Sequence, residues 1–122
     1  MTYRIVLVDD ETSIRRLIRA VLKEHTLFEA ADGAKGLALI REVHPDIVLL
    51  DMMMPQLNGL QVAQRVSLDP TIASIPIIML SAKGQAFEKE EAYQSGIKHY
   101  LVKPFLPDVL RTTIKKVISE AR

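Results

Sequence analysis

Polar residues that could share one chemical task stand at the ends of four short apolar runs. The runs are followed in turn by Asp9 and Asp10, by Asp51, by Ser81 and by Lys103. A single acid in such a place is most often a turn residue or a helix cap, and a single Ser or Lys is ordinarily a cap or a solvated charge. Capping requires neither a Lys nor two acids in one turn, so the joint occurrence indicates a common site.

The three carboxylates predict a cation site. Two carboxylates about 4 Å apart at an effective dielectric constant near 20 repel each other by roughly 4 kcal/mol, and a third acid adds to the conflict. A divalent cation bound between the carboxylates would offset this repulsion. Hard carboxylate oxygens without Cys or His nearby favour Mg²⁺, which binds one or two protein carboxylates and keeps several waters.

The hydroxyl of Ser81 and the ammonium of Lys103 indicate that a phosphoryl group is also bound. A Lys is a mobile point charge suited to one phosphate oxygen, and a hydroxyl donates to another. A carboxylate at the centre of the cluster is then the natural acceptor, since it can attack phosphorus and become an acyl phosphate. In phosphoryl transfer the protein mainly positions groups and neutralises charge, and these residues supply both.

Alternating periodicities predict the elements that bring these residues together. Short apolar runs occur at residues 5–8, 26–30, 47–50, 75–80 and 100–102. The segments between them carry apolar residues at helical spacing, such as Ile14, Leu17, Ile18, Val21 and Leu22, and later Leu110, Ile114, Val117 and Ile118. Strands that are apolar on both faces and separated by helices predict a parallel sheet covered on each side. We therefore expect an open, doubly wound (βα)5 three-layer α/β sandwich, whose ligands bind beyond the carboxyl ends of the strands.

Turn and cap residues agree with this division. Ser13 or Thr12 can cap the first helix, and Asp32 and Asn58 can cap later ones. Gly96 is typical of the end of a helix expected over residues 85–95.

Composition excludes several classes of protein. The chain has 122 residues, 48% of them hydrophobic and 25% charged, which is typical of one globular domain spanning 1–122. A formal net charge of +1 gives no reason to expect a nucleic-acid or membrane partner. Cysteine is absent, so neither a disulfide framework nor a thiolate metal site is expected. The three histidines lie far apart in sequence, so we do not expect them to bind a metal together. No apolar run approaches the roughly 20 residues of a membrane span, and no signal-peptide pattern is present, so we expect a soluble, cytoplasmic protein.

The sequence resembles the receiver domains of bacterial two-component response regulators. The matching pieces are "VLVDDE", "DIVLLDMMMPQLNG", "IPIIMLSAKG" and "YLVKPF", and their order and intervals match over essentially the whole chain. The resemblance implies the flavodoxin-like (CheY-like) fold with strand order 2-1-3-4-5. It also implies a signalling switch of a phosphorelay rather than an enzyme.

Residue by residue, the resemblance implies Asp51 as the phospho-acceptor. Asp10 and Asp51 would ligate Mg²⁺ directly together with the backbone carbonyl of Met53, and Asp9 would hold a metal-bound water. The Met53 side chain offers no polar group to orient an attacking water, which favours slow autodephosphorylation. Gly59 matches the turn that shapes the loop after Asp51.

The same resemblance implies the phosphate contacts and the switch. Ser81 would hydrogen-bond one phosphate oxygen and Lys103 would pair with another. Lys103 and Pro104 match the family's cis peptide bond. Tyr100 matches the aromatic switch residue, which turns inward once Ser81 moves toward the phosphate.

The implied partners are a sensor histidine kinase or histidine phosphotransfer protein as donor, and a downstream protein as target. We expect the target to bind the surface made by the helix over 85–95, the strand over 100–102 and the last helix, the surface called α4-β5-α5 in this family. The charge run inside the first of these segments leaves it few apolar anchors, which makes it easy to displace. The chain would be a monomer or a phosphorylation-dependent dimer.

Three other functions compete with the switch. A Mg²⁺-dependent phosphatase with an aspartyl-phosphate intermediate commonly has a second acid two residues after the nucleophile, where this chain has Met53, and a cap insertion for which there is no room. A flavodoxin-like FMN binder would have a Ser/Thr-rich phosphate loop after the first strand and a Trp against the flavin, and this chain has neither. A degenerate receiver that never accepts phosphate is disfavoured because Asp9, Asp10, Asp51, Ser81 and Lys103 are all present.

Overall fold

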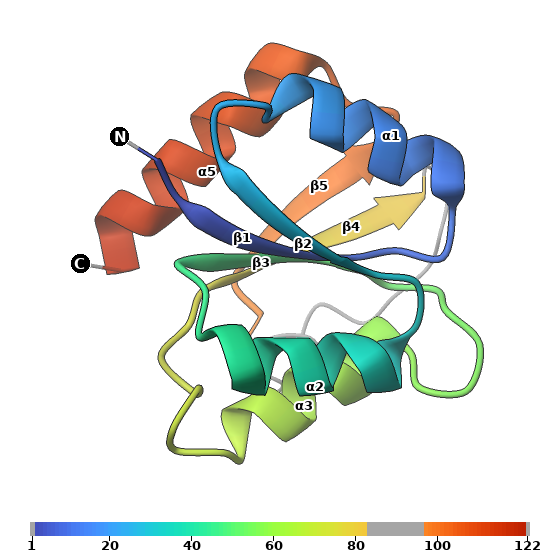
Figure 1. The fold of residues 1–122 in the computed structure, drawn as a ribbon, viewed down its shortest axis with the longest axis vertical. Helices are drawn as coiled ribbons and strands as arrows, with labels where there is room; N and C mark the ends of the chain where they lie inside the picture. Colours follow the sequence, from blue (N-terminus) through green and yellow to red (C-terminus); the bar gives the residue numbers. More distant parts are fainter. Residues whose placement is uncertain (1, 83–96, 122) are drawn as a thin grey trace.

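The computed structural model describes residues 2–82 and 97–121, which form a five-stranded parallel sheet between two layers of helices (Figure 1). The strand order β2-β1-β3-β4-β5 confirms the expected doubly wound fold. In chain order the described elements are β1 (Arg4–Val8), α1 (Thr12–Val21), β2 (Thr26–Ala30), α2 (Gly33–Val43), β3 (Ile47–Asp51), α3 (Gly59–Ser67), β4 (Ile77–Ala82), β5 (His99–Lys103) and α5 (Pro107–Ala121).

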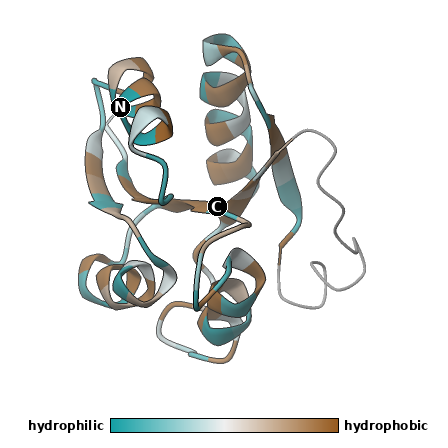
Figure 2. Cartoon of the chain, turned by 90° about the vertical axis from the view of Figure 1, so that its right-hand side faces the viewer, coloured by the Kyte–Doolittle hydropathy of each residue, from teal (hydrophilic) through white to brown (hydrophobic). Residues whose placement is uncertain are grey.

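Each face of the sheet has its own hydrophobic core because the central strands are apolar at successive positions, and successive side chains point to opposite faces. All five residues of β3 are buried. Alternate strand residues such as Leu7 and Leu49 pack under α1 and α5, whereas Val6 and Val48 pack under α2 and α3. Figure 1 shows α1 and α5 on one side of the sheet and α2 and α3 on the other, and Figure 2 shows the hydrophobic colour of the central strands.

Local capping explains where α2 and α3 begin. The side chain of Asp32 accepts a hydrogen bond from the backbone N–H of Lys35. Asn58 and Gln61 form a reciprocal capping box, each side chain bonded to the other's backbone N–H at 2.9 Å. Both caps were expected from the sequence.

The predicted cap of α1 was wrong. Thr12 and Ser13 do not precede the helix; the N-cap is Glu11, and its side chain makes no capping bond. The turn is organised instead by the carboxylate of Asp9, which accepts the backbone N–H of Glu11 at 2.9 Å.

The fourth strand lies two residues later than expected, at Ile77–Ala82 rather than 75–80. The N–H of Ile75 donates to the carbonyl of Ile72 in the preceding turn, and Pro76 has no N–H to donate, so the strand begins after them. Ser81 consequently lies within the strand. The helix expected over residues 85–95 and its cap Gly96 lie outside the described residues.

Candidate functional site

The parallel register brings three of the predicted site residues to one edge of the sheet. Asp51 ends β3 and Lys103 ends β5, while Asp9 follows β1 directly. All three continue the alternation of side chains that face α1 and α5, because Leu7, Leu49 and Leu101 stand two residues before them and belong to that core. The polar groups therefore extend one face of the sheet beyond its apolar part.

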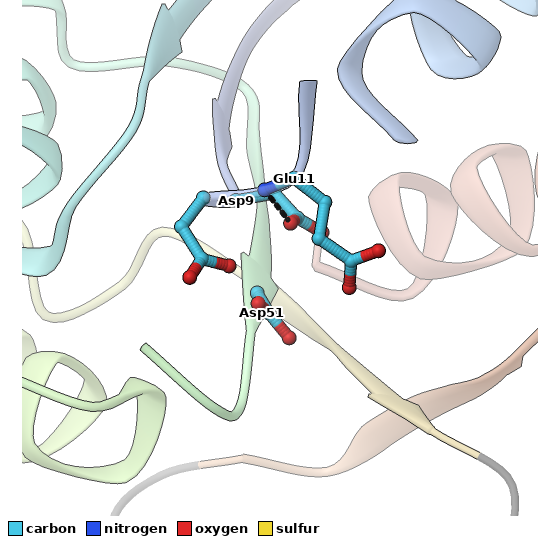
Figure 3. Close-up of side chains that lie close together, drawn as sticks. Asp9, Glu11 and Asp51 are labelled. Atoms are coloured by element: carbon cyan, nitrogen blue, oxygen red, sulfur yellow. Dashed lines mark hydrogen bonds between the residues drawn. The ribbon is translucent and has the colours of Figure 1, made fainter. Parts of the chain in front are cut away.

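Asp9 is wholly buried and is held through both its backbone and its side chain. Its carboxylate accepts the Glu11 N–H through Oδ1 and the Lys103 ammonium through Oδ2, at 2.9 and 2.8 Å. Its backbone N–H donates to the carbonyl of Ala30, and its own carbonyl accepts a 2.7 Å bond from the guanidinium of Arg15. Figure 3 shows Asp9 close to Glu11 and Asp51. These four hydrogen bonds hold Asp9, and with it the loop after β1, in one position.

Among the residues that the structure describes, four acids converge at this edge. One carboxylate oxygen each of Asp9, Asp10, Glu11 and Asp51 lies within 4.8 Å of the others. Asp9 and Asp51 are buried, whereas Asp10 and Glu11 are exposed. The cluster thus has a buried floor and a solvent-facing side through which a ligand can enter.

Lys103 is the cation at the centre of this cluster. Its Nζ lies 2.8 Å from Asp9, 3.3 Å from Asp51 and 3.4 Å from Glu11. Burial by itself lowers the pKa of Lys103, but its hydrogen bond and charge interaction with Asp9, reinforced by Asp51, raise that pKa above its ordinary value. The ammonium therefore stays charged. Among the described residues, one positive charge is shared by three carboxylates, which leaves their cluster with excess negative charge.

Burial and this excess negative charge together raise the pKa of Asp51. Burial raises its pKa, and repulsion by Asp9 adds to the effect, so that the pKa reaches about 6 despite the opposing influence of Lys103. The N–H of Met53 lies 3.4 Å from Asp51 Oδ1, a further weak donor. The carboxylate is thus ionised at neutral pH in a place that disfavours its charge.

The loop after Asp51 turns tightly because of Gly59. The N–H of Gly59 donates to the carbonyl of Met52 at 3.0 Å. A Cβ at position 59 would lie 2.4 Å from the carbonyl oxygen of Asp51, closer than any side chain can approach. Glycine therefore lets the start of α3 close directly over the end of β3.

Ser81 and Tyr100 lie on the other face of the sheet edge. Ser81 is buried and stands two residues after Met79, whose side chain belongs to the core under α2 and α3. Tyr100 is half-buried against the same core. Because Met79 pairs with Tyr100 and Ser81 with Val102, the serine and the tyrosine are diagonal neighbours on one face. The peptide bond between Lys103 and Pro104 is cis.

Two described residues at the site, Glu11 and Arg15, were not predicted to have a role there from the sequence. Glu11 was visible as a third consecutive acid, but its contact with Lys103 depends on how the turn folds. Arg15 looked like an ordinary polar position on a helix, and only the structure brings it to the carbonyl of Asp9.

The donor set fits a hard divalent cation. In the described part of the chain, all of the converging ligand atoms are carboxylate oxygens, and neither His nor Cys takes part. The negative excess around Lys103 gives a physical reason for a cation to bind. Asp9, Asp10 and Asp51 are the residues that could hold it, with Glu11 close by.

Comparison with known proteins decides the family. The model of the response regulator receiver domain matches residues 5–115. The chain belongs to this family. Among relatives, PilH of Pseudomonas aeruginosa is 35% identical over 118 residues, covering 95% of this chain and 98% of PilH. The DNA-binding dual master transcriptional regulator RpaA of Synechocystis is 39% identical over 104 residues, covering 84% of this chain but only 43% of RpaA.

Solved structures agree with that assignment. Chemotaxis protein CheY4 of Vibrio cholerae has a TM-score of 0.87 at 30% identity, covering 96% of this chain and 99% of CheY4. A response regulator from Chloroflexus aurantiacus has a TM-score of 0.90 at 28% identity, covering 98% and 99%. As a receiver domain, the chain is a signalling module of two-component systems, which weighs against the phosphatase and FMN-binding alternatives. Within the described parts of the chain, no helix combines the length and hydrophobicity needed to cross a membrane.

Proposed function

We propose that this receiver domain, spanning 1–122, is switched by transfer of a phosphoryl group to Asp51 in a Mg²⁺-dependent reaction. The observation that carries the proposal is the position of Asp51. Its buried carboxylate lies 3.3 Å from the Lys103 ammonium, inside a group of acids whose other members include the exposed Asp10. An anionic nucleophile, a fixed cation and a place for a metal thus occur together.

In this proposal Asp10 and Asp51 would hold Mg²⁺ directly together with the backbone carbonyl of Met53, and Asp9 would hold it through a water. When bound, Mg²⁺ supplies positive charge that offsets both the acids and the oxygens of the incoming phosphoryl group. The rigid backbone of Asp9 keeps its carboxylate in place for this task.

The transfer step uses the residues of the sheet edge. An oxygen of Asp51 attacks phosphorus and forms an acyl phosphate, while the bond from phosphorus to the donor breaks and its electron pair leaves with the donor. Lys103 then pairs with a phosphoryl oxygen in place of the Asp51 carboxylate, and Ser81 donates its hydroxyl to another. A sensor histidine kinase or a histidine phosphotransfer protein in the cytoplasm is the proposed donor.

The switch connects the phosphoryl group to the outer part of the sheet. Ser81 moves toward the phosphate, and the space next to it on the same face becomes available to its diagonal neighbour Tyr100. The proposed output surface includes β5 and α5, which carry the exposed apolar residues Val102 and Val109. Its third element, expected over residues 85–95, lies outside the described residues. A downstream protein, rather than nucleic acid, is the proposed target.

We also propose that the acyl phosphate is long-lived. Met53 is 63% exposed beside the proposed acceptor, and its side chain has no polar group to orient a water. The loss of phosphate in the absence of any partner should therefore be slow. Replacement of Met53 by Asn should accelerate it, as followed by intact-protein mass spectrometry.

The direct test is labelling by acetyl phosphate with Mg²⁺. Wild-type protein should gain the mass of one phosphoryl group, and Asp51→Asn should gain none while keeping its fold. Asp108→Asn is the matched control, because it makes the same change at a side chain that is 95% exposed on α5. Labelling of Asp51→Asn, or of wild type equally well in excess chelator, would contradict the proposal.

A further inference from the structure

Arg15 is a half-buried cation of α1 that touches the acidic loop without being part of the acidic cluster. Its side chain is only 18% exposed. Its Nη1 donates to the carbonyl oxygen of Asp9 at 2.7 Å, which is the shortest of the hydrogen bonds that hold Asp9. The contact is to the backbone, so Arg15 leaves the Asp9 carboxylate free for Lys103 and for a metal-bound water.

A second contact fixes Arg15 itself. Its Nε lies 3.5 Å from Oε1 of Glu29 on β2. Glu29 is in turn held by Arg19, whose Nε and Nη2 donate to its two oxygens at 2.8 Å each. This bidentate pairing orients the Glu29 carboxylate. The three side chains therefore form a strut that runs from the edge strand β2 across α1 to the loop after β1.

The strut supplies a constraint that the helix itself lacks. The N-cap side chain of α1, Glu11, makes no capping bond, so capping does not fix the turn between Asp9 and the helix. The N–H of Asp9 is bonded to Ala30 on β2 and its carbonyl to Arg15. Both backbone groups of Asp9 are thus tied to β2, one directly and one through the strut.

We propose that Arg15 is a positioning residue that holds the loop of Asp9, Asp10 and Glu11 in the geometry that binds Mg²⁺, and that Glu29 acts through it. The inference rests on the proposed Mg²⁺-dependent function. Residues that orient metal ligands commonly change metal affinity by about tenfold or more when they are replaced.

The sign of the effect separates this role from simple electrostatics. Arg15 carries a positive charge close to the site, and by charge alone its removal should tighten the binding of Mg²⁺. A positioning role predicts the reverse, since the released loop must be ordered again each time the ion binds. The same substitution thus gives opposite results under the two accounts.

The experiment measures the Mg²⁺ dissociation constant by isothermal titration calorimetry for Arg15→Met and for Arg16→Met. Arg16 is the next residue of α1 and is exposed, which makes it the matched control for loss of one positive charge. We expect about tenfold weaker binding in Arg15→Met. Arg16→Met should bind the ion as tightly as wild type or slightly more tightly. Arg15→Lys should recover part of the loss, because an ammonium can reach one acceptor but cannot span two as a planar guanidinium does.

Glu29→Gln completes the design. It should weaken binding in the wild-type background and add nothing in Arg15→Met, because its effect passes through Arg15. Equal losses in both backgrounds would overturn that part of the inference. Unfolding of each metal-free variant is measured in parallel, since a purely structural role would lower stability while leaving the Mg²⁺ affinity unchanged.

Failure of this inference is distinguishable from failure of the proposed function. If wild-type protein binds no Mg²⁺, the proposed function fails. If wild type binds the ion and Arg15→Met binds it equally or more tightly, only the positioning role fails. Should Arg15→Met not fold, Arg15→Lys decides, with weaker binding than wild type expected and unchanged binding contradictory.

Discussion

Replacement of Asp51 by Asn should stabilise the metal-free protein at neutral pH, although it removes the proposed phospho-acceptor. The folded-state pKa of Asp51 is raised from 3.8 to about 6. A group with a raised folded pKa favours folding while it is protonated, and that contribution is fully present below pH 3.8 and lost as the pH rises through about 6. At neutral pH the ionised carboxylate therefore works against the fold. An amide of the same shape carries no charge.

The magnitude follows from the shift in pKa. A rise from 3.8 to about 6 corresponds to roughly 3 kcal/mol of destabilisation once Asp51 is ionised. The exposed side of the cluster screens part of this, and the amide loses the charge interaction with Lys103. We expect a net gain of about 1–2 kcal/mol. For a domain of this size that corresponds to about 4–8 °C in Tm.

The assay is urea unfolding in excess chelator, with wild type and Asp51→Asn compared at about pH 7.5 and about pH 4.5. The advantage of the Asn variant should be present at the higher pH and should shrink at the lower one, where wild-type Asp51 is protonated. With Mg²⁺ at the higher pH, wild type should gain more stability than the variant. An Asn variant no more stable than wild type at the higher pH, or an advantage that does not depend on pH, would refute this account of the site.

Further substitutions test the cation, the cap and the tight turn. Lys103→Met should destabilise the metal-free protein by about 3 kcal/mol in urea unfolding, because three acids lose their shared cation, and Mg²⁺ should restore much of the loss. Equal losses with and without Mg²⁺ would argue against a metal in this cluster. Asn58→Ala should cost about 1 kcal/mol by the same assay, since it breaks the capping box with Gln61; a neutral result would contradict that role. Gly59→Ala should cost about 2 kcal/mol and slow acetyl phosphate labelling, because its Cβ meets the Asp51 carbonyl; unchanged labelling would show that the turn does not position the acceptor.

Most of the fold and the centre of the site could be predicted from the sequence. The apolar runs located all five strands because buried parallel strands are apolar on both faces. Strand ends meet at one edge of such a sheet, so Asp9, Asp51 and Lys103 were expected together, and the structure places them within hydrogen-bonding distance. The strand order came from the family resemblance, because the run of elements along the chain does not specify it.

Contacts that depend on the rotation of a helix and the path of a turn could not be predicted. Arg15 reaches the Asp9 carbonyl from a helix that begins at Thr12, whereas the sequence suggested a cap at Thr12 or Ser13. The contact of Glu11 with Lys103 depends on the same turn. A shift of one residue turns a helix by about 100°, which is enough to carry such a side chain away from the site.

Paramagnetic broadening by Mn²⁺ tests most directly the claim that these strand ends form a metal site beside the acceptor. Mn²⁺ accepts the same oxygen ligands as Mg²⁺, and it broadens the amide NMR signals of residues close to it. The signals of Asp9, Asp10, Glu11 and Asp51 should broaden first, excess Mg²⁺ should restore them, and Asp10→Asn should require more Mn²⁺ for the same effect. The exposed acid Glu42 on α2 provides the control, since Glu42→Gln should behave as wild type. Broadening that begins elsewhere, or that Mg²⁺ does not reverse, would contradict the account.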